Sequence, residues 1–275
     1  MNGILYIVST PIGNLEDITL RALHVLKSVD VIAVEDTRRS LKLLNHYGIS
    51  KPLISYWKEK ERARSDKIIG RLLSGQSVAL ISDAGTPGIS DPGTVLVKRA
   101  IQETVHIVSI PGPTSFVAAL SVSGLATDEF TFIGFLPSKK TQRLNALKSL
   151  MLESRTLVFY EAPHRILRTL TDMNDTLAER HIVVAKEMTK IHEEILRGTI
   201  PEVLSTLQKA TIAGEYVIIV EGRSDKKRPL DNDVLMEVAV LMKRGLGRKE
   251  AVKKTAKAYG LRTKDLYDRS LSKTP

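Results

Sequence analysis

Three stiff loops, each directly behind an apolar run typical of a buried strand, carry the residue types best suited to holding a ligand. They span residues 10–14, 82–93 and 111–115, and together they contain five of the 11 prolines in the chain. Proline fixes φ, while glycine lets the main chain adopt positive φ and approach a ligand closely. Open α/β sheets bind ligands at the carboxyl ends of their strands. We therefore expect one pocket built from all three loops.

The loop at residues 82–93 is the longest of the three and reads Ser-Asp-Ala-Gly-Thr-Pro-Gly-Ile-Ser-Asp-Pro-Gly. We expect the loop to end in a turn into a helix that starts at Pro92, with Asp91 as the N-cap. Such a turn needs neither Asp83 nor the Thr-Pro-Gly insert. The surplus residues favour a ligand-binding loop.

Four further polar clusters stand beside expected strands, at residues 35–39, 160–165, 186–190 and 214–217. Their acids could cap helices, accept ligand hydrogen bonds or take up a proton. Each cluster alone is explained equally well by caps, exposed turns and ordinary ion pairs. Their joint placement at strand ends favours a functional role for the set.

Several common classes of site are missing from the sequence. There is no G-x-x-x-x-G-K-[ST] phosphate loop, no G-x-G-x-x-G dinucleotide fingerprint and no G-x-S-x-G nucleophile elbow. The six histidines show no spacing suited to zinc, and no cysteine is present, so we expect no metal site. The pocket must take another kind of ligand.

Apolar segments and helical patterns alternate from residue 3 to about residue 115, as in βαβ units with a parallel sheet. A second set follows a break at 124–128, and two adjacent strands near 182–198 leave no room for a helix between them. We predict two α/β domains, one with a largely parallel N-terminal sheet and one with a mixed C-terminal sheet, plus a small basic helical C-terminal module. The expected boundaries give domains at 1–118, 119–223 and 224–275, and the charged, apolar-free segment at residues 224–229 is expected to be a linker.

The composition is that of a globular protein, with 275 residues, 43% hydrophobic and 26% charged. No apolar run approaches the roughly 20 residues that span a bilayer, and the first apolar segment lacks the basic region that precedes a signal sequence. The absence of cysteine fits a reducing compartment. We expect a cytoplasmic protein that makes no membrane contact.

Positive charge is concentrated near the C-terminus. Residues 224–275 carry 14 Lys or Arg against 7 Asp or Glu, so this segment holds +7 of the net charge of +10. Three short helical patterns separated by glycines resemble a helix-turn-helix module. Clustered positive charge indicates nucleic-acid binding, although a solvated helix face would have the same composition.

Six motifs in chain order make the sequence similar to the tetrapyrrole-methylase-like family. They lie at residues 10–15, 35–38, 82–93, 110–113, 160–165 and 214–216, within the first 223 residues. Within the family, the chain most resembles bacterial enzymes that methylate a ribose of small-subunit ribosomal RNA. Tetrapyrrole-modifying members carry a loop that reads approximately Gly-Gly-Asp-Pro, whereas this chain has Ser82-Asp83-Ala84-Gly85 and a longer insert. That departure disfavours a porphyrin-like substrate.

The resemblance implies S-adenosylmethionine bound in a trough between the two α/β domains, a homodimer, and 2′-O-methylation of a cytidine in the decoding region. The RNA partner would be small-subunit ribosomal RNA, free or in the assembled 30S subunit. The resemblance carries the cofactor contacts onto the following residues: Pro11, Asp83, Ala84, Gly85, Ile89, Ser90, Thr114, Ser115, Tyr160, Ala185, Glu215 and Tyr216.

Methylation of a ribose hydroxyl requires alignment with the methyl donor and removal of the hydroxyl proton. The candidates for this step are Glu35, Asp36, Glu161 and Lys186. We expect RNA phosphates to be bound by the following cations: Arg38, His164, Arg165, Lys249, Lys253, Lys254 and Lys257.

Two other functions fit parts of the sequence. A C-methyltransferase of a tetrapyrrole-like macrocycle would share the fold but would gain nothing from the basic tail. A non-enzymatic nucleic-acid-binding protein would explain the tail but would leave the three stiff loops without a purpose.

Overall fold

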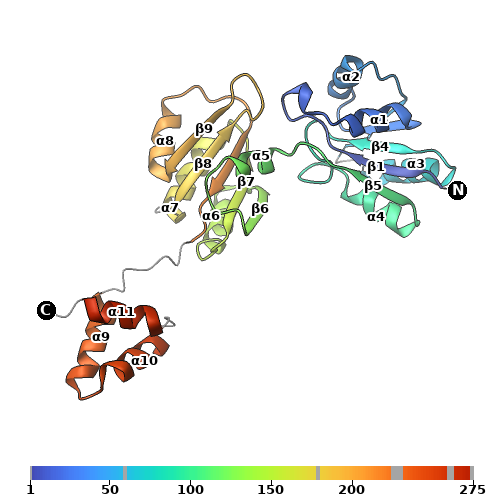
Figure 1. Ribbon diagram of the computed structural model, residues 1–275. Helices are drawn as coiled ribbons and strands as arrows, with labels where there is room; N and C mark the ends of the chain where they lie inside the picture. The colour runs from blue at the N-terminus through green and yellow to red at the C-terminus, as the bar shows by residue number, and fades with distance from the viewer. Residues whose placement is uncertain (1, 58–60, 178–179, 224–231, 259–262, 273–275) are drawn as a thin grey trace. The chain divides into compact units, whose positions relative to one another are not determined.

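The structure is a computed structural model that describes residues 2–57, 61–177, 180–223, 232–258 and 263–272. The chain divides into two compact units, residues 1–223 and 224–275. The first unit contains two five-stranded sheets, and the second is helical (Figure 1). The boundary expected at residue 118 stays a prediction.

The first sheet is entirely parallel, with strand order β3-β2-β4-β1-β5. Its strands are β1 (Ile4–Val8), β2 (Val31–Val34), β3 (Leu53–Ser55), β4 (Val78–Ile81) and β5 (His106–Ile110). Every residue of β2 and β4 is buried, as expected when helices cover both faces of a parallel sheet. All five carboxyl ends therefore lie at one edge of the sheet.

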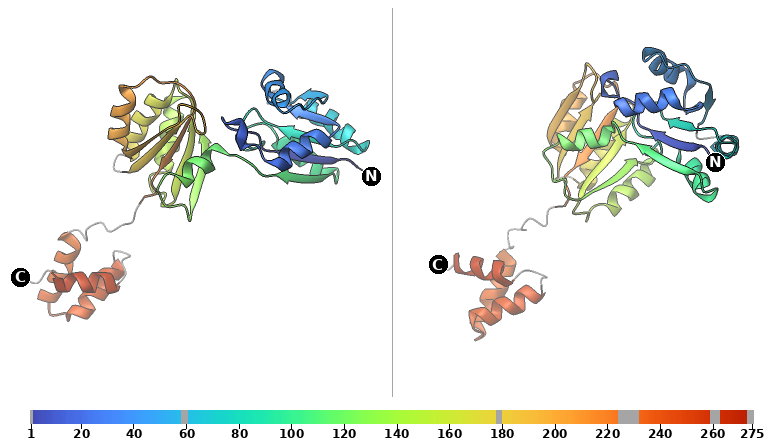
Figure 2. Two further views of the ribbon diagram at one scale, coloured as in Figure 1. Left: turned by 45° about the horizontal axis from the view of Figure 1, so that its top comes forward. Right: turned by 45° about the vertical axis from the view of Figure 1, so that its right-hand side comes forward.

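Helices cover both faces of this sheet (Figure 2). One core cluster joins α3 (Glu61–Leu73) and α4 (Thr94–Gln102) to one face, and a second joins α1 (Leu20–Ser28) and α2 (Thr37–His46) to the other. A short 3-10 helix, η1 (Leu15–Asp17), precedes α1, whose N-cap is Thr19. The Thr19 hydroxyl accepts a hydrogen bond from the Ala22 N–H at 3.1 Å.

The second sheet is mixed, with strand order β6-β7-β10-β8-β9. Its strands are β6 (Phe130–Phe135), β7 (Thr156–Glu161), β8 (His181–Lys186), β9 (Glu194–Thr199) and β10 (Tyr216–Val220). Only β6 and β7 run parallel, and β8 and β9 form the antiparallel pair expected from the lack of a helix between them. One core cluster packs α6 (Lys140–Ser149), α7 (Ile166–Leu177) and α8 (Ile200–Gln208) against this sheet, and another packs α5 (Ser115–Ser121).

The described part of the C-terminal unit contains α9 (Asn232–Lys243), α10 (Arg248–Ala258) and α11 (Thr263–Ser272). These helices share a small core of their own that includes Val238, Val252 and Leu266. The expected linker at residues 224–229 lies outside the described residues. No helix in the described part of the chain is long and apolar enough to cross a membrane.

The predicted α/β fold class is confirmed: helices pack against two sheets, one parallel and one mixed, and a helical module follows at the C-terminus. One local prediction is wrong, because the helix expected to start at Pro92 begins at Thr94 and its N-cap is Gly93. Asp91 is therefore not a helix cap.

Candidate active site

Hydrogen bonds tie the three loops of the first sheet to one another. Thr10 and Gly85 form an antiparallel bridge, with N···O distances of 2.9 and 3.0 Å. The Thr86 hydroxyl lies 2.8 Å from that of Ser9 and 2.9 Å from that of Thr114. Thr86, from the loop after β4, thus connects the loop after β1 with the loop after β5.

Glycine is required where these loops meet. Gly85 has a φ of +80°, a conformation that side-chain-bearing residues rarely adopt. A Cβ atom at Gly112 would lie 2.8 Å from the Cβ of Ser9. Both observations agree with the close approach of backbones predicted for these loops.

Two side chains from beneath the 82–93 loop satisfy the first N–H groups of α4. Glu61 accepts a hydrogen bond from Gly93 N–H at 2.8 Å, and the Tyr56 hydroxyl accepts one from Leu96 N–H at 3.2 Å. Burial raises the pKa of Tyr56 to about 12, so its hydroxyl stays neutral. Asp91 makes no capping hydrogen bond to α4, and it lines the cavity described next, where a hydrogen bond with Ser82 partly offsets the rise in its pKa.

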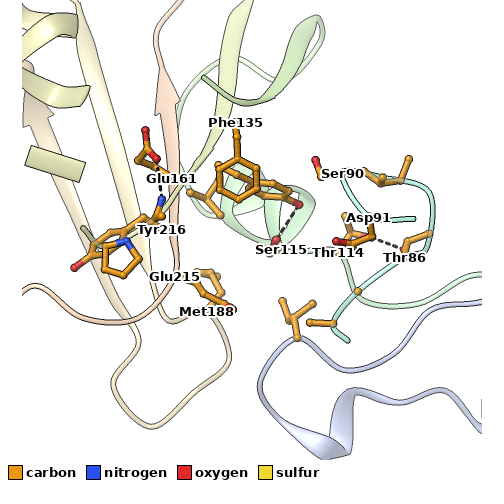
Figure 3. A pocket seen from close by; sticks show the side chains of 18 residues that line it. Thr86, Ser90, Asp91, Thr114, Ser115, Phe135, Glu161, Met188, Glu215 and Tyr216 are labelled. Atoms are coloured by element: carbon orange, nitrogen blue, oxygen red, sulfur yellow. Dashed lines mark hydrogen bonds between the residues drawn. The ribbon is translucent and has the colours of Figure 1, made fainter. Parts of the chain in front are cut away.

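The loops enclose one side of a cavity of about 340 Å³ (Figure 3). The other side comes from the second sheet, through the ends of β6, β7 and β10 and the segment after β8. The lining residues are Ile12, Ala84, Gly85, Thr86, Ile89, Ser90, Asp91, Thr114, Ser115, Phe135, Tyr160, Glu161, Ala162, Pro163, Met188, Glu215, Tyr216 and Val217.

The lining of this cavity is acidic. It includes three carboxylates, Asp91, Glu161 and Glu215, and none of the described residues that line it is Lys, Arg or His. Burial and the nearby carboxylate of Glu35 raise the pKa of Asp91 to about 7. Two of the three carboxylates pair with cations that lie outside the lining, Glu161 with Arg165 at 3.2 Å and Glu215 with Lys190 at 3.2 Å. The lining itself offers acidic oxygens and no cation, which suits a cationic ligand better than a phosphate-bearing one.

Aromatic side chains form part of the wall. The Tyr160 ring packs edge-on against Phe132 at 5.1 Å and beside Phe135 at 5.6 Å. Its hydroxyl accepts a hydrogen bond from Ser115 Oγ at 2.9 Å. This contact joins α5 to β7 at the cavity wall and fixes the tyrosine ring.

Nine of the twelve residues proposed as cofactor contacts line this cavity. Pro11, Asp83 and Ala185 do not: Pro11 and Ala185 are buried, the latter in the core of the second sheet. Asp83 instead accepts a hydrogen bond from Asp36 N–H at 3.0 Å and pairs with Arg39 at 3.3 Å. It joins the loop after β2 to the loop after β4.

Of the four proposed catalytic residues, only Glu161 lines the cavity. Its carboxylate accepts hydrogen bonds from the Ala162 N–H at 2.8 Å and the Thr169 hydroxyl at 2.6 Å, and it lies 3.2 Å from Arg165 Nε. These partners occupy much of the hydrogen-bonding capacity of its two oxygens.

The other three proposed catalytic residues lie outside the lining. Asp36 caps α2 and pairs with Arg38 at 2.9 Å, which holds the pKa of Asp36 at about 2. Lys186 lies 3.7 Å from Glu194. Burial and the neighbouring Asp83 raise the pKa of Glu35, which sits close enough to influence Asp91. Glu35 is thus the member of this group most directly coupled to the cavity.

The proposed RNA-binding cations are distributed over several elements. Arg38 and His164 are exposed, whereas Arg165 is half-buried behind Glu161. The four lysines of α10 are all exposed: Lys249, Lys253, Lys254 and Lys257.

The structure adds lining residues that were not among the predicted cofactor or catalytic residues, above all Asp91, Phe135 and Met188. Asp91 belonged to the predicted loop, but we expected it to be a helix cap. Phe135 ends a strand and Met188 lies in a polar turn, so neither carried a chemical signal. No group of three or more possible metal ligands occurs among the residues that the structure describes.

Comparison with known proteins adds two groups of relatives. Residues 4–204 match the family described as Tetrapyrrole (Corrin/Porphyrin) Methylases. The chain is 45% identical to a "Ribosomal RNA small subunit methyltransferase I" of Halalkalibacterium halodurans, covering 97% of this chain and 94% of the relative. The protein of the same name from Escherichia coli O157:H7 is 42% identical, covering 98% and 95%.

Solved structures with the same fold are more distant in sequence. Uroporphyrin-III C-methyl transferase from Thermus thermophilus, complexed with S-adenyl homocysteine, superposes with a TM-score of 0.58 at 18% identity. It matches 80% of this chain and 97% of its own. A conserved hypothetical protein from Aeropyrum pernix K1 gives a TM-score of 0.64 at 18% identity, covering 84% and 92%.

Proposed function

The chain belongs to the tetrapyrrole methylase family, and on this premise we propose that it is an S-adenosylmethionine-dependent RNA methyltransferase. Its product is a 2′-O-methylated cytidine in the decoding region of small-subunit ribosomal RNA. The relatives named for small-subunit ribosomal RNA are 41–45% identical and match nearly the whole chain, including the basic C-terminal unit. The solved tetrapyrrole methyltransferases are only 18–21% identical and cover about 80% of it.

The cofactor proposal rests on the lining of the acidic cavity. Among the described residues, this lining contains carboxylates and aromatic rings but no cation. S-adenosylmethionine carries a sulfonium and an ammonium group against one carboxylate, so it is a net cation. Carboxylates of Asp91 and Glu215 attract this charge, and the aromatic faces of Phe135 and Tyr160 suit a sulfonium. The residues present therefore fit this cofactor better than a nucleoside triphosphate, for whose phosphates the described lining offers no cation.

The methyl donor supplies an electrophilic methyl group when it is bound, and the protein must align the ribose hydroxyl and remove its proton. Asp91 is the best placed acceptor, because its carboxylate faces the cavity and its pKa of about 7 lies near the working pH. Glu161 acts as a positioning residue through its bonds to Thr169 and Arg165. Glu35 contributes by keeping the pKa of Asp91 high.

Three further features belong to the same proposal. The protein acts in the cytoplasm, forms a homodimer and uses the exposed lysines of α10 to contact RNA phosphates. The charge of the C-terminal unit supports the last of these, since phosphate neutralisation dominates affinity for RNA.

The test is incubation of the protein with S-adenosylmethionine labelled in the methyl group and with small ribosomal subunits from a strain that lacks the enzyme. We expect label in the ribosomal RNA, mapped to the ribose of one cytidine and resistant to alkaline cleavage. A parallel reaction contains a uroporphyrinogen in place of the subunits. Label in the macrocycle, or none in RNA, would overturn the proposal.

A further inference from the structure

A second cavity of about 370 Å³ lies beside α6 and α7 in the second sheet domain. Four of the seven side chains that line it are cations and one is an acid: Ser138, Lys140, Arg143, Arg165, Arg168, Thr171 and Asp172. None of these described lining residues is aromatic or aliphatic. Such a lining can bind a charged group, but it has no surface on which a base could stack.

Arg143 lines this cavity and is held in place by a buried ion pair. Its side chain is only 6% exposed and pairs with Asp172, whose Oδ2 lies 2.6 Å from Nη2 and 2.7 Å from Nε. The remaining guanidinium nitrogen donates to the carbonyl oxygens of Ser138 at 3.1 Å and Pro137 at 3.4 Å. Because all three nitrogens are occupied, Arg143 holds the loop before α6 against α7.

Arg165 connects this cavity with the acidic one through its ion pair with Glu161. Its Nη2 donates to the carbonyl oxygen of Leu136 at 2.6 Å, and its Nε lies 3.2 Å from Glu161. Glu161 lines the acidic cavity, and Arg165 lines the basic one. A group bound to the basic cavity is therefore held next to the reaction site.

Two cations of this lining, Lys140 and Arg168, are available to bind a ligand. Lys140 begins α6 and Arg168 lies in the first turn of α7; both are exposed, and neither forms an ion pair with a described carboxylate. The N-cap of α6 is Lys139, whose side chain makes no capping hydrogen bond. The first N–H groups of α6 thus add to the positive potential.

We propose that the basic cavity binds backbone phosphates of the substrate RNA, with Lys140 and Arg168 as the contacts and Arg143 and Arg165 as the frame. The proposal rests on RNA being the substrate. Charge-assisted hydrogen bonds from lysine and arginine are the usual means of holding a phosphate. Phosphate binding here positions the strand so that its target ribose reaches the acidic cavity.

The test compares two double variants of the full chain that lose the same charge. Lys140→Gln/Arg168→Gln removes the two proposed contacts. Lys148→Gln/Lys209→Gln removes two exposed lysines that lie outside the basic cavity, one of them on the same helix. Fluorescence anisotropy measures the affinity of each protein for a labelled fragment of small-subunit ribosomal RNA over a range of KCl concentrations.

We expect the first variant to bind RNA roughly tenfold more weakly at about 0.1 M salt and to lose about 1.4 from the slope of log K against log salt, as two lost phosphate contacts require. The control should follow the wild type. Calorimetric affinity for S-adenosylmethionine should be the same in all three proteins. Equal RNA slopes in the two variants would overturn the proposal, even if the wild type methylates RNA.

Inorganic phosphate provides a second arm of the experiment. If phosphate alone raises the unfolding temperature of the wild type but not of Lys140→Gln/Arg168→Gln, while RNA affinity is unchanged, the cavity holds a free anion and the RNA proposal is wrong. Loss of RNA affinity in the first variant with no methyl transfer by the wild type would instead reject the proposed reaction and keep the phosphate site.

Discussion

The two cavities of the N-terminal unit are similar in volume, about 340 and 370 Å³, and opposite in charge. The described lining of one contains three carboxylates and no cation; that of the other contains four cations and one carboxylate. They meet at the ion pair between Glu161 and Arg165. The difference supports the proposed division, with the cationic methyl donor in the acidic cavity and phosphates of the RNA strand in the basic one.

For ligand binding by this unit, the local distribution of charge is more informative than the net charge. The first 223 residues carry only +3 of the net charge, yet they contain both a site that repels phosphate and one that attracts it. Net charge indicates a nucleic-acid partner only on average over a surface. Here the two chemistries are separated by a single ion pair.

The largest expected effect is a loss of stability on breaking the buried ion pair between Arg143 and Asp172 in the basic cavity. Asp172→Asn leaves the Arg143 guanidinium buried without its counter-charge, which should lower the free energy of unfolding by about 3 kcal/mol. Urea denaturation measures this loss. The control is Asp66→Asn, which breaks the exposed pair with Arg99 and should cost less than about 1 kcal/mol. Equal losses in the two variants would mean that the buried pair does not frame the cavity.

The second largest effect is expected on the rate of methyl transfer, from a change in the acidic cavity. Asp91→Asn removes the proposed proton acceptor and should slow single-turnover methyl transfer about 100-fold at saturating RNA and methyl donor. RNA affinity should not change, because Asp91 does not line the basic cavity. Rapid-quench measurement of labelled RNA gives the rate. A rate within about twofold of the wild type would return the search to Glu35 and Glu161.

The raised pKa of Asp91 also predicts a pH dependence of stability. In the folded state this carboxyl titrates near pH 7, and in the unfolded chain near 3.8, so between these values the folded state holds a proton that the unfolded state releases. Its contribution to stability is lost as the pH rises from about 4 to 7. The stability of Asp91→Asn relative to the wild type should therefore increase over this range, as measured by urea denaturation at pH 4.5, 6 and 7.5. A difference that stays constant with pH would contradict the assignment.

The smallest effect is expected in the C-terminal unit. Lys253→Gln removes one exposed cation of α10 and should weaken RNA binding only a few-fold, with a decrease of about 0.7 in the salt slope. Anisotropy titrations against the same RNA fragment measure both quantities. Lys148→Gln is the matched control. An unchanged slope in Lys253→Gln would remove this lysine from the RNA contacts.

The fold was predictable because its signals are local and repeated. Apolar runs such as the one at residues 77–81 alternate with helical patterns, and the short spacing near residue 190 forces an antiparallel pair in the second sheet. The three stiff loops were predictable for the same reason. The Thr86 hydroxyl contacts the hydroxyls of Ser9 and Thr114, and this link between the loops agrees with the expected single pocket.

The role of Asp91 was not predictable, because the N–H groups at the start of α4 are satisfied by Glu61 and Tyr56, across 32 and 40 residues of sequence. The basic cavity was missed for a similar reason. Lys140 and Arg168 come from different helices, and the buried pair of Arg143 with Asp172 that frames them spans 29 residues. Pairings at such separations leave no periodic or motif signal in one sequence.

The division of the two ligands between the two cavities is tested most directly by the concentration dependence of methyl transfer in Lys140→Gln/Arg168→Gln. We predict that the RNA concentration for half-maximal rate rises roughly tenfold, while the S-adenosylmethionine concentration for half-maximal rate stays at the wild-type value. A rise in the requirement for S-adenosylmethionine, or no change in the requirement for RNA, would contradict the account.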